Sequence, residues 1–215
     1  MSWICSAVIF DLDGVLVDSN ETSERHWKIW AAQHGVDYAA IEAIHHGRPT
    51  VEIMKVVAPH LDAVEQARLK EDTEADDTTG LSAFPGAARL MNALPKGHWA
   101  IATSGKRRTA TIRLTHCGLP IPDIFITAND ISRGKPDPEP YLKAIEWLGF
   151  SPADCVVIED APAGIESARA AGARVIGVAT TNAPENLSRA ELVLSRLDQL
   201  QLSIMDSRLH LSWTE

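Results

Sequence analysis

The sequence predicts an α/β fold, in which helices cover both faces of a parallel sheet and a small all-helical segment is inserted after the first strand. After Pro85, short apolar runs alternate with helical stretches of about ten residues, which is typical of a parallel sheet. Between residues 21 and 79, in contrast, the sequence has no convincing strand. We therefore expect an α/β core domain formed by residues 1–17 and 82–215, and a helical domain formed by residues 18–81.

The first element is an apolar run, residues 7–10, which predicts a buried strand that ends at the polar turn 11–14. Glycine and proline residues then separate four helical stretches. These cover residues 24–34, 39–46, 51–58 and 63–74. The acidic stretch at residues 71–77 closes the last of them, and we expect it to be a solvated helix end that leads into a linker.

The second half of the chain supplies the rest of the expected sheet. Helices are expected at residues 86–94, 107–116, 139–148 and 163–171. Strands are expected at residues 99–102, 124–126, 155–158 and 174–178. We expect the residues beyond 185 to complete the core, and we identify no chemistry in them.

Composition restricts the class of protein. The chain has 215 residues and a formal net charge of −9, which makes it a poor candidate for binding nucleic acid or an anionic membrane surface. Its three cysteines form no C-x-x-C pair, which fits a reducing compartment. The apolar run at residues 3–10 is too short for a membrane span and has no basic leader. We therefore predict a cytoplasmic protein that is a monomer or a weak homo-oligomer.

Polar side chains follow four of the expected strands. In chain order they are Asp11 and Asp13, Thr103 and Ser104, Lys135, and Glu159 and Asp160. Each short motif alone is most often an ordinary turn or helix cap. Because ligands bind outside the carboxyl ends of strands in open α/β sheets, their occurrence at four strand ends favours one shared site.

This set of side chains suits phosphoryl transfer. Asp11 and Asp160 can supply hard oxygen ligands to Mg²⁺, and the ion and Lys135 would supply the positive charge that the acidic chain otherwise lacks. A carboxylate can attack phosphorus and form an aspartyl-phosphate. Asp13 is placed to protonate the leaving oxygen and later to activate water. The Thr103 hydroxyl and neighbouring backbone N–H groups would bind phosphate oxygens.

The same segments resemble the four motifs of the haloacid dehalogenase (HAD) superfamily. In chain order, the matching segments are residues 10–19, 102–105, 134–141 and 157–164. The resemblance extends to residue 181 and implies a Rossmann-like core with a helical cap inserted after the first motif. It implies that Asp11 is the nucleophile and Asp13 the general acid and base. The implied phosphoryl-binding residues are Thr103, Ser104 and Lys135, and the implied Mg²⁺ ligands are Asp11, Asp13 (through its carbonyl) and Asp160, with Glu159 adjacent.

A narrower resemblance concerns the substrate. The chain is similar to the sugar- and polyol-phosphate phosphatases, which include glycerol-phosphate, 2-deoxyglucose-6-phosphate and hexose-phosphate hydrolases. The similar segments are residues 94–105, 125–130 and 134–141, and the expected cap segment 45–50 also resembles theirs. This implies a Mg²⁺-dependent phosphatase that acts on a small phosphorylated metabolite. We expect Arg48, with His45 or His46, to lie over the site and contact the hydroxyl-bearing part of the substrate.

Cap motion is part of the expected mechanism, because closure would exclude bulk water from the phosphoryl site. We expect the hinges near residues 17–20 and 79–83. A β-phosphoglucomutase-like reaction remains an alternative because it uses the same four motifs. That family places a histidine ten residues after the general acid and an arginine three residues after the cap glycine, where this chain has Ser23 and Thr50.

Three further alternatives are weaker. A dehalogenase would have no use for Asp13 as an acid in phosphoryl transfer. A phosphonate hydrolase needs a cap lysine that forms a Schiff base, whereas Lys28, Lys55 and Lys70 are expected on the solvated surface of the helical segment. A non-catalytic binding or sensor protein on this scaffold need not keep every reacting group, all of which this chain keeps.

Overall fold

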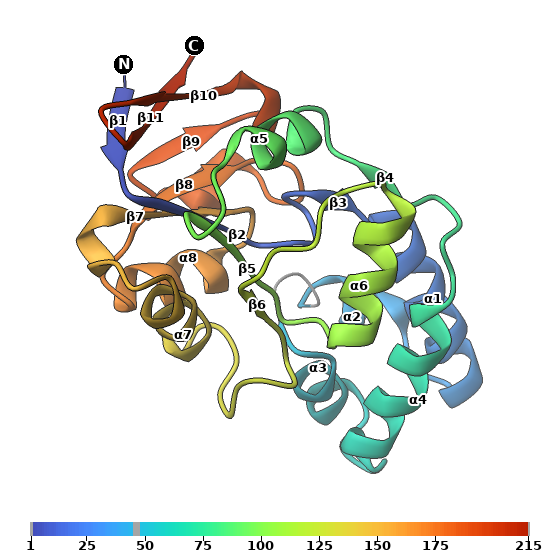
Figure 1. The fold of residues 1–215 in the computed structure, drawn as a ribbon. Coiled ribbons are helices and arrows are strands. Elements are labelled where there is room, and N and C mark those ends of the chain that lie inside the picture. Colours follow the sequence, from blue (N-terminus) through green and yellow to red (C-terminus); the bar gives the residue numbers. More distant parts are fainter. Residues whose placement is uncertain (1, 45–47, 215) are drawn as a thin grey trace.

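A six-stranded parallel sheet lies at the centre of the larger part of the molecule, as the computed structural model shows for residues 2–44 and 48–214 (Figure 1). In spatial order its strands are β6 (Phe125–Ile126), β5 (Trp99–Ala102), β2 (Ala7–Phe10), β7 (Cys155–Glu159), β8 (Arg174–Val178) and β9 (Leu192–Leu194). Every pairing in this sheet is parallel. The predicted fold class is confirmed, and β2 occupies the middle of the sheet.

Helices cover both faces of the sheet because side chains alternate between the faces along each strand. The helices are α5 (Ala87–Ala93), α6 (Arg107–His116), α7 (Glu139–Leu148) and α8 (Pro162–Ala170). Val8 and Phe10 belong to the apolar cluster that includes residues of α5 and α6. Ala7 and Ile9 belong to the cluster that includes residues of α7 and α8. Among the residues described, no helix is long and apolar enough to cross a membrane.

A second group of helices lies beside the sheet and corresponds to the predicted helical insertion (Figure 1). Its members are α1 (Asn20–His34), α2 (Tyr38–Glu42), α3 (Thr50–Val57) and α4 (Ala63–Ala75). They enclose an apolar cluster of their own, which includes Trp27 and Ile53. The Asp62 carboxylate caps the first turn of α4 by accepting hydrogen bonds from two backbone N–H groups. We call α1–α4 the cap.

The two chain crossings between the sheet and the cap lie side by side. They are the short strands β3 (Val17–Asp18) and β4 (Ser82–Ala83), which pair in antiparallel fashion. The Phe84 N–H also donates to the Leu16 carbonyl at 3.0 Å. Both crossings fall within the segments where we expect hinges, and their flexing stays a prediction.

A three-stranded antiparallel sheet departs from the sequence expectations. It consists of β1 (Ser2–Cys5), β11 (Arg208–Trp213) and β10 (Leu200–Met205). The apolar run 3–10, treated as one segment, therefore divides at Ser6 between two sheets. Residues beyond 185 do complete the core, since Leu209 and Leu211 are buried in it, but β10 and β11 form a hairpin of their own. Trp3 and Trp213 pack edge to face across it, with ring centroids 5.6 Å apart.

Candidate active site

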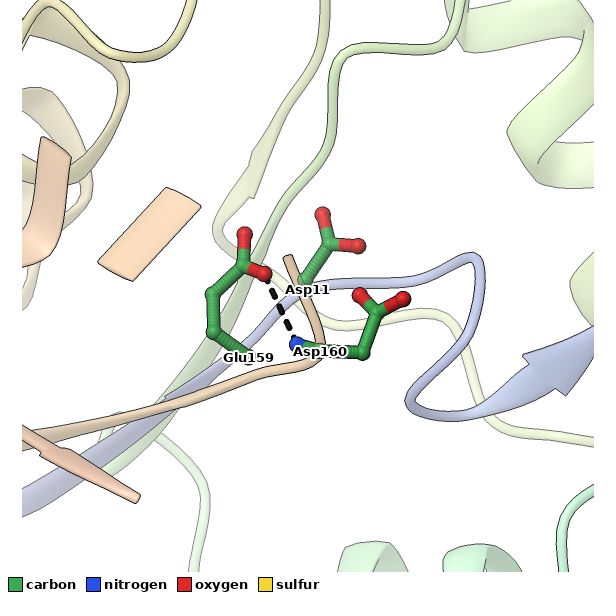
Figure 2. Close-up of side chains that lie close together, drawn as sticks. All are labelled: Asp11, Glu159 and Asp160. Atoms are coloured by element: carbon green, nitrogen blue, oxygen red, sulfur yellow. Dashed lines mark hydrogen bonds between the residues drawn. The ribbon is translucent and has the colours of Figure 1, made fainter. Parts of the chain in front are cut away.

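The carboxyl ends of β2 and β7 bring three acidic side chains together. The register of these neighbouring strands pairs Phe10 with Ile158, so Asp11 emerges beside Glu159 and Asp160. Figure 2 shows the three side chains gathered at this edge of the sheet. One oxygen from each carboxylate lies within 4.8 Å of the others, and all three residues are buried. Neighbouring strand ends therefore meet as the sequence predicts.

The Lys135 ammonium lies between two of these carboxylates. Its Nζ donates to Asp11 Oδ1 at 2.6 Å and to Glu159 Oε1 at 2.7 Å, from a loop between β6 and α7. Burial alone would lower the pKa of Lys135, but Asp11 and Glu159 raise it well above its usual value. The lysine is therefore held as a cation beside the Asp11 carboxylate.

Glu159 uses both of its oxygens to hold other groups in place. Its Oε1 accepts from Lys135 and from the Tyr141 hydroxyl at 2.9 Å. Its Oε2 accepts from the N–H groups of Asp160 at 2.8 Å and Ala161 at 2.9 Å. Since two donors already occupy each oxygen, Glu159 is suited to orient Lys135 rather than to bind a ligand itself.

Asp11 and Asp160 form the part of the cluster that suits a cation. Burial, opposed by Lys135, raises the pKa of Asp11 to about 7, and burial beside Glu159 and Asp11 raises that of Asp160 well above its usual value. Three carboxylates that share one ammonium repel one another, and the raised pKa values of Asp11 and Asp160 show that their charged forms are unfavourable without a further cation. Oxygen donors with unmet charge are what a hard divalent cation requires, so the donor set fits Mg²⁺.

Two residues that the sequence analysis did not identify fix Asp160. The Thr181 hydroxyl donates to Asp160 Oδ2, and Asn182 Nδ2 donates to the Asp160 carbonyl at 3.1 Å. Both follow the end of β8, so the strand-end argument used for the other loops could have found them. Thr181 orients the carboxylate in the way that outer-shell hydrogen bonds orient metal ligands, and Asn182 holds the backbone of the same residue.

Two glycines leave room for these carboxylates. A Cβ on Gly14 would lie 2.1 Å from Asp160 Oδ2, and a Cβ on Gly164 would lie 1.7 Å from Glu159 Oε1. Gly14 also has φ of +85°, which disfavours any other residue. Backbone and carboxylate approach each other here more closely than any side chain would permit.

Thr103 and Ser104 lie at the end of β5, as predicted, and face the same cavity. The Gly105 N–H donates to Thr103 Oγ1 at 3.0 Å. This contact uses a lone pair of the hydroxyl and leaves its own proton free to be donated. Thr103 is buried, so a phosphate oxygen in the cavity would be its natural acceptor.

Asp13 lies apart from the three clustered carboxylates. Its Oδ1 accepts from the Ser19 hydroxyl at 2.8 Å and from Arg113 Nη1 at 2.5 Å. Arg113 belongs to α6 and reaches Glu74 of α4 with its other terminal nitrogen, Nη2, at 2.6 Å. Arg113 was not predicted from the sequence, because no motif signal marks it.

Glu74 of the acidic stretch 71–77 and one cap lysine depart from the sequence expectation of a solvated surface, whereas Asp72 and Asp76 of the same stretch are exposed as expected. Glu74 is buried, and it pairs with Lys70, which is buried as well. The reason is that α4 packs against α6, which turns this face of α4 toward the core. Lys28 and Lys55 are exposed, as expected.

The described site residues all line one cavity of about 190 Å³ between the sheet edge and the cap. From the core these are Asp11, Asp13, Thr103, Ser104, Lys135, Glu159 and Asp160. Arg48 lines the cavity from the cap side, next to Pro49 and Thr50, and is exposed. His45 and His46, predicted to share its role, lie outside the described residues.

Comparison with known proteins identifies the family. A sequence model described as haloacid dehalogenase-like hydrolase matches residues 8–178. The chain is 39% identical to hexitol phosphatase A of Escherichia coli, covering 93% of this chain and 94% of that protein. It is also 39% identical to glycerol-1-phosphate phosphohydrolase 2 of Saccharomyces cerevisiae, covering 82% of this chain and 75% of that protein. The crystal structure of a hydrolase from Pseudomonas syringae aligns with a TM-score of 0.79 at 30% identity, covering 90% of this chain and 94% of that one. The chain belongs to the haloacid dehalogenase-like hydrolase family.

Proposed function

We propose that this protein is a Mg²⁺-dependent phosphatase that hydrolyses sugar or polyol phosphates through an aspartyl-phosphate on Asp11. The observation that carries the proposal is the contact between Lys135 Nζ and Asp11 Oδ1 at 2.6 Å, inside a cavity that also holds Thr103 and Asp13. It holds one oxygen of a buried carboxylate and leaves the other available to attack phosphorus.

In the first step, the free oxygen of Asp11 forms a bond to phosphorus while the bond from phosphorus to the substrate oxygen breaks. Asp13 gives its proton to that departing oxygen, so an alcohol leaves. In the second step, water attacks the same phosphorus, Asp13 takes a proton from that water, and Asp11 is released as a carboxylate. Lys135 and Thr103 contact the phosphoryl oxygens throughout and offset their charge.

Asp11, Asp160 and the Asp13 carbonyl would hold the magnesium ion. A bound Mg²⁺ would supply additional positive charge to the phosphoryl oxygens. Glu159, whose oxygens are already occupied, would keep Lys135 in position beside it.

The substrate class is supported by the relatives and by the size of the cavity. The relatives named above are a hexitol phosphatase and a glycerol-1-phosphate phosphohydrolase. A cavity of about 190 Å³ is smaller than typical sites for drug-sized ligands. On the cap side it offers hydroxyl groups from Ser23 and Thr50 and the guanidinium of Arg48, all suited to a hydroxyl-bearing substrate.

Two alternatives are less well supported. The positions where a β-phosphoglucomutase-like enzyme has histidine and arginine hold Ser23 and Thr50, and both line the cavity. A Schiff-base lysine for a phosphonate hydrolase would have to be Lys70, but its ammonium is bound to Glu74 and lies 4.4 Å from the centre of the Trp27 ring. A mutase would therefore lack its distinguishing histidine and arginine at these positions, and a phosphonate hydrolase would lack an available cap lysine at Lys70.

We place the protein in the cytoplasm because Cys5, Cys117 and Cys155 are all free. The predicted monomeric or weakly self-associating state stays a prediction.

The test is the release of inorganic phosphate from a panel of sugar, polyol and glycolate phosphates, measured with Mg²⁺, with EDTA, and with the Asp11→Asn variant. We expect release that needs the metal and disappears in the variant, with polyol or hexose phosphates ranking first. Release that persists in Asp11→Asn would contradict the covalent route. The absence of release from every substrate, with the protein folded, would favour the mutase.

A further inference from the structure

An ion-pair network of four alternating charges, three of them buried, connects the cap to Asp13. Arg113 of α6 contacts Asp13 Oδ1 through Nη1 at 2.5 Å and Glu74 Oε1 through Nη2 at 2.6 Å. Lys70 of α4 donates to the other Glu74 oxygen. Arg113 and Glu74 each keep only 8% of their surface exposed, and Lys70 keeps 6%. The mechanism described above assigns no role to Arg113, Glu74 or Lys70.

A contribution to folding stability is a weak explanation for this ion-pair network. Burying ion pairs costs desolvation energy, and apolar residues of similar volume often serve stability equally well. The guanidinium has a more specific property, because its planar fork fixes two acceptors in a defined geometry. Arg113 uses that fork to hold one carboxylate from the core and one from the cap.

The contacts at Asp13 leave one particular oxygen free. Ser19 and Arg113 both donate to Oδ1. Oδ2 points toward the loop after β5, since it lies 3.9 Å from where a Cβ on Gly105 would be, next to Thr103 Oγ1. The oxygen without these donors therefore faces the place where the phosphoryl group is expected.

We propose that Arg113 is a positioning residue that holds Asp13 with Oδ2 toward the departing substrate oxygen, and that Glu74 fixes Arg113 from the cap. This inference rests on the proposed phosphatase function. Because Glu74 belongs to α4 and Arg113 to α6, the ion-pair network is complete only when the cap lies against the core. Cap closure and orientation of the acid are thereby linked through one guanidinium.

The experiment uses the leaving group to separate acid positioning from a general structural effect. An aliphatic alcohol is a poor leaving group and needs a proton from Asp13, whereas p-nitrophenolate leaves with little help. Because hydrolysis of the phosphoryl-enzyme is common to both substrates, the comparison is made in kcat/KM, which reports the first step, in which the substrate oxygen departs. We expect Arg113→Met to lower kcat/KM about 100-fold for a hexitol or glycerol phosphate and no more than about 3-fold for p-nitrophenyl phosphate, within the range of general acid catalysis. Asp13→Asn should show the same division in kcat/KM, while its slower hydrolysis of the phosphoryl-enzyme lowers kcat for both substrates.

Arg108→Met provides a matched control. Arg108 also lies on α6 and also pairs with a residue at the end of α4, Asp76, but it is exposed and makes no contact with Asp13. We expect this variant to stay within about 2-fold of the wild type for both substrates, as for other exposed ion pairs. The inference would be overturned if Arg113→Met lowered kcat/KM by the same factor for both substrates. It would also be overturned if Arg113→Met had no more effect on kcat/KM than Arg108→Met.

Two milder variants keep the test decisive if Arg113→Met does not fold. Glu74→Gln leaves the Arg113–Asp13 contact in place and removes the charged anchor on the cap. Arg113→Lys keeps a cation but cannot span both carboxylates. Each should lower kcat/KM about 10-fold for the aliphatic phosphate and leave kcat/KM for p-nitrophenyl phosphate unchanged, consistent with partial loss of general acid catalysis. Equal losses of kcat/KM for both substrates would overturn the inference. A wild-type protein inactive toward both substrates would overturn the proposed function itself.

Discussion

The two sides of the cavity are assembled in different ways. On the core side, Lys135 joins Asp11 and Glu159, and all three belong to the sheet edge or the loops next to it. On the cap side, Arg113 and Glu74 meet only because α4 packs against α6, across the boundary between cap and sheet. Both sides use buried ion pairs, but only the core side is complete within one structural unit.

The core side therefore carries the groups that react with the phosphoryl group, and the cap side carries the groups that position Asp13. The core cluster is held by backbone register and by hydrogen bonds to Glu159, so cap movement would leave it intact. On the cap side, the contact between Glu74 and Arg113 depends on the position of the cap, so cap closure can change how Arg113 holds Asp13. Substitutions of comparable buried groups on the two sides should therefore have different consequences for activity.

The largest expected difference lies between the two buried lysines. Lys135→Met should reduce kcat about 1000-fold, because it removes a preorganised cation from the phosphoryl oxygens. Lys70→Met, the matched change on the cap, should reduce kcat by no more than about 10-fold, since Lys70 reaches Asp13 only through Glu74 and Arg113. Steady-state phosphate release measures both variants. Equal losses would show that the two sides are not functionally distinct.

The lysine variants should also differ in stability without Mg²⁺. Lys135→Met leaves Asp11 and Glu159 without their cation, which costs on the order of 3–5 kcal/mol of unfolding free energy. In Lys70→Met, Glu74 keeps its pair with Arg113, so the cost should be smaller. Urea unfolding in EDTA measures this cost. A stable Lys135→Met protein that has lost activity would strengthen the chemical interpretation of Lys135.

Gly164→Ala tests how tightly the core side is built. The new Cβ would lie 1.7 Å from Glu159 Oε1, so Glu159 must move and Lys135 must lose its support. We expect kcat to fall about 100-fold, as a displacement of about 1 Å in a catalytic group commonly causes. Ala170→Ser, an exposed change on the same helix, should have wild-type activity. A fully active Gly164→Ala enzyme would contradict the orienting role of Glu159.

Thr181→Val addresses the metal-binding part of the core side. It removes the hydroxyl that donates to Asp160 Oδ2 while conserving shape. The Mg²⁺ concentration that gives half-maximal activity should rise about 10-fold or more, as for other outer-shell partners of metal ligands. Thr73→Val, the same change on an exposed part of α4, should leave it unchanged. An unaltered magnesium requirement in Thr181→Val would argue against Asp160 as a ligand.

The smallest expected effect concerns the pH dependence of stability on the cap side. Burial alone would raise the pKa of Glu74, but Lys70 and Arg113 outweigh burial and lower this pKa below its usual value of 4.5. The unfolded chain then binds a proton at Glu74 more readily than the folded one, so this contribution to stability is present above pH 4.5 and is lost as the pH falls below it. Glu74→Gln should flatten this acidic limb in unfolding experiments between pH 3 and 7. If the unfolding free energy of Glu74→Gln fell with decreasing pH as steeply as that of the wild type, Glu74 would not be ionised in the folded protein.

The core side could be predicted because it depends on local order along the chain. Asp11, Thr103, Lys135 and Asp160 follow strands of a parallel sheet, and parallel strands bring their carboxyl ends to one edge whatever the details of packing. The helices of the cap were predictable from glycine and proline breaks for the same local reason.

The cap side could not be predicted, because its contacts join segments far apart in the sequence. Arg113 meets Asp13 across 100 residues and Glu74 across 39, and neither pairing has a spacing signal. The acidic composition of residues 71–77 suggested solvent, whereas the packing of α4 on α6 buries Glu74. The division of the first apolar run at Ser6 could not be predicted for the same reason, because β1 pairs with β11, about 200 residues away in the sequence.

The most direct test of the account is to trap the phosphoryl group on the enzyme. Asp13→Asn should slow hydrolysis of the intermediate, so p-nitrophenyl phosphate with Mg²⁺ should leave phosphate attached to the chain after rapid quenching. We predict one phosphoryl group per chain, located by peptide mass spectrometry on Asp11 and absent from the Asp11→Asn, Asp13→Asn double variant. Turnover without any trapped phosphoryl group, or a phosphoryl group on another residue, would contradict it.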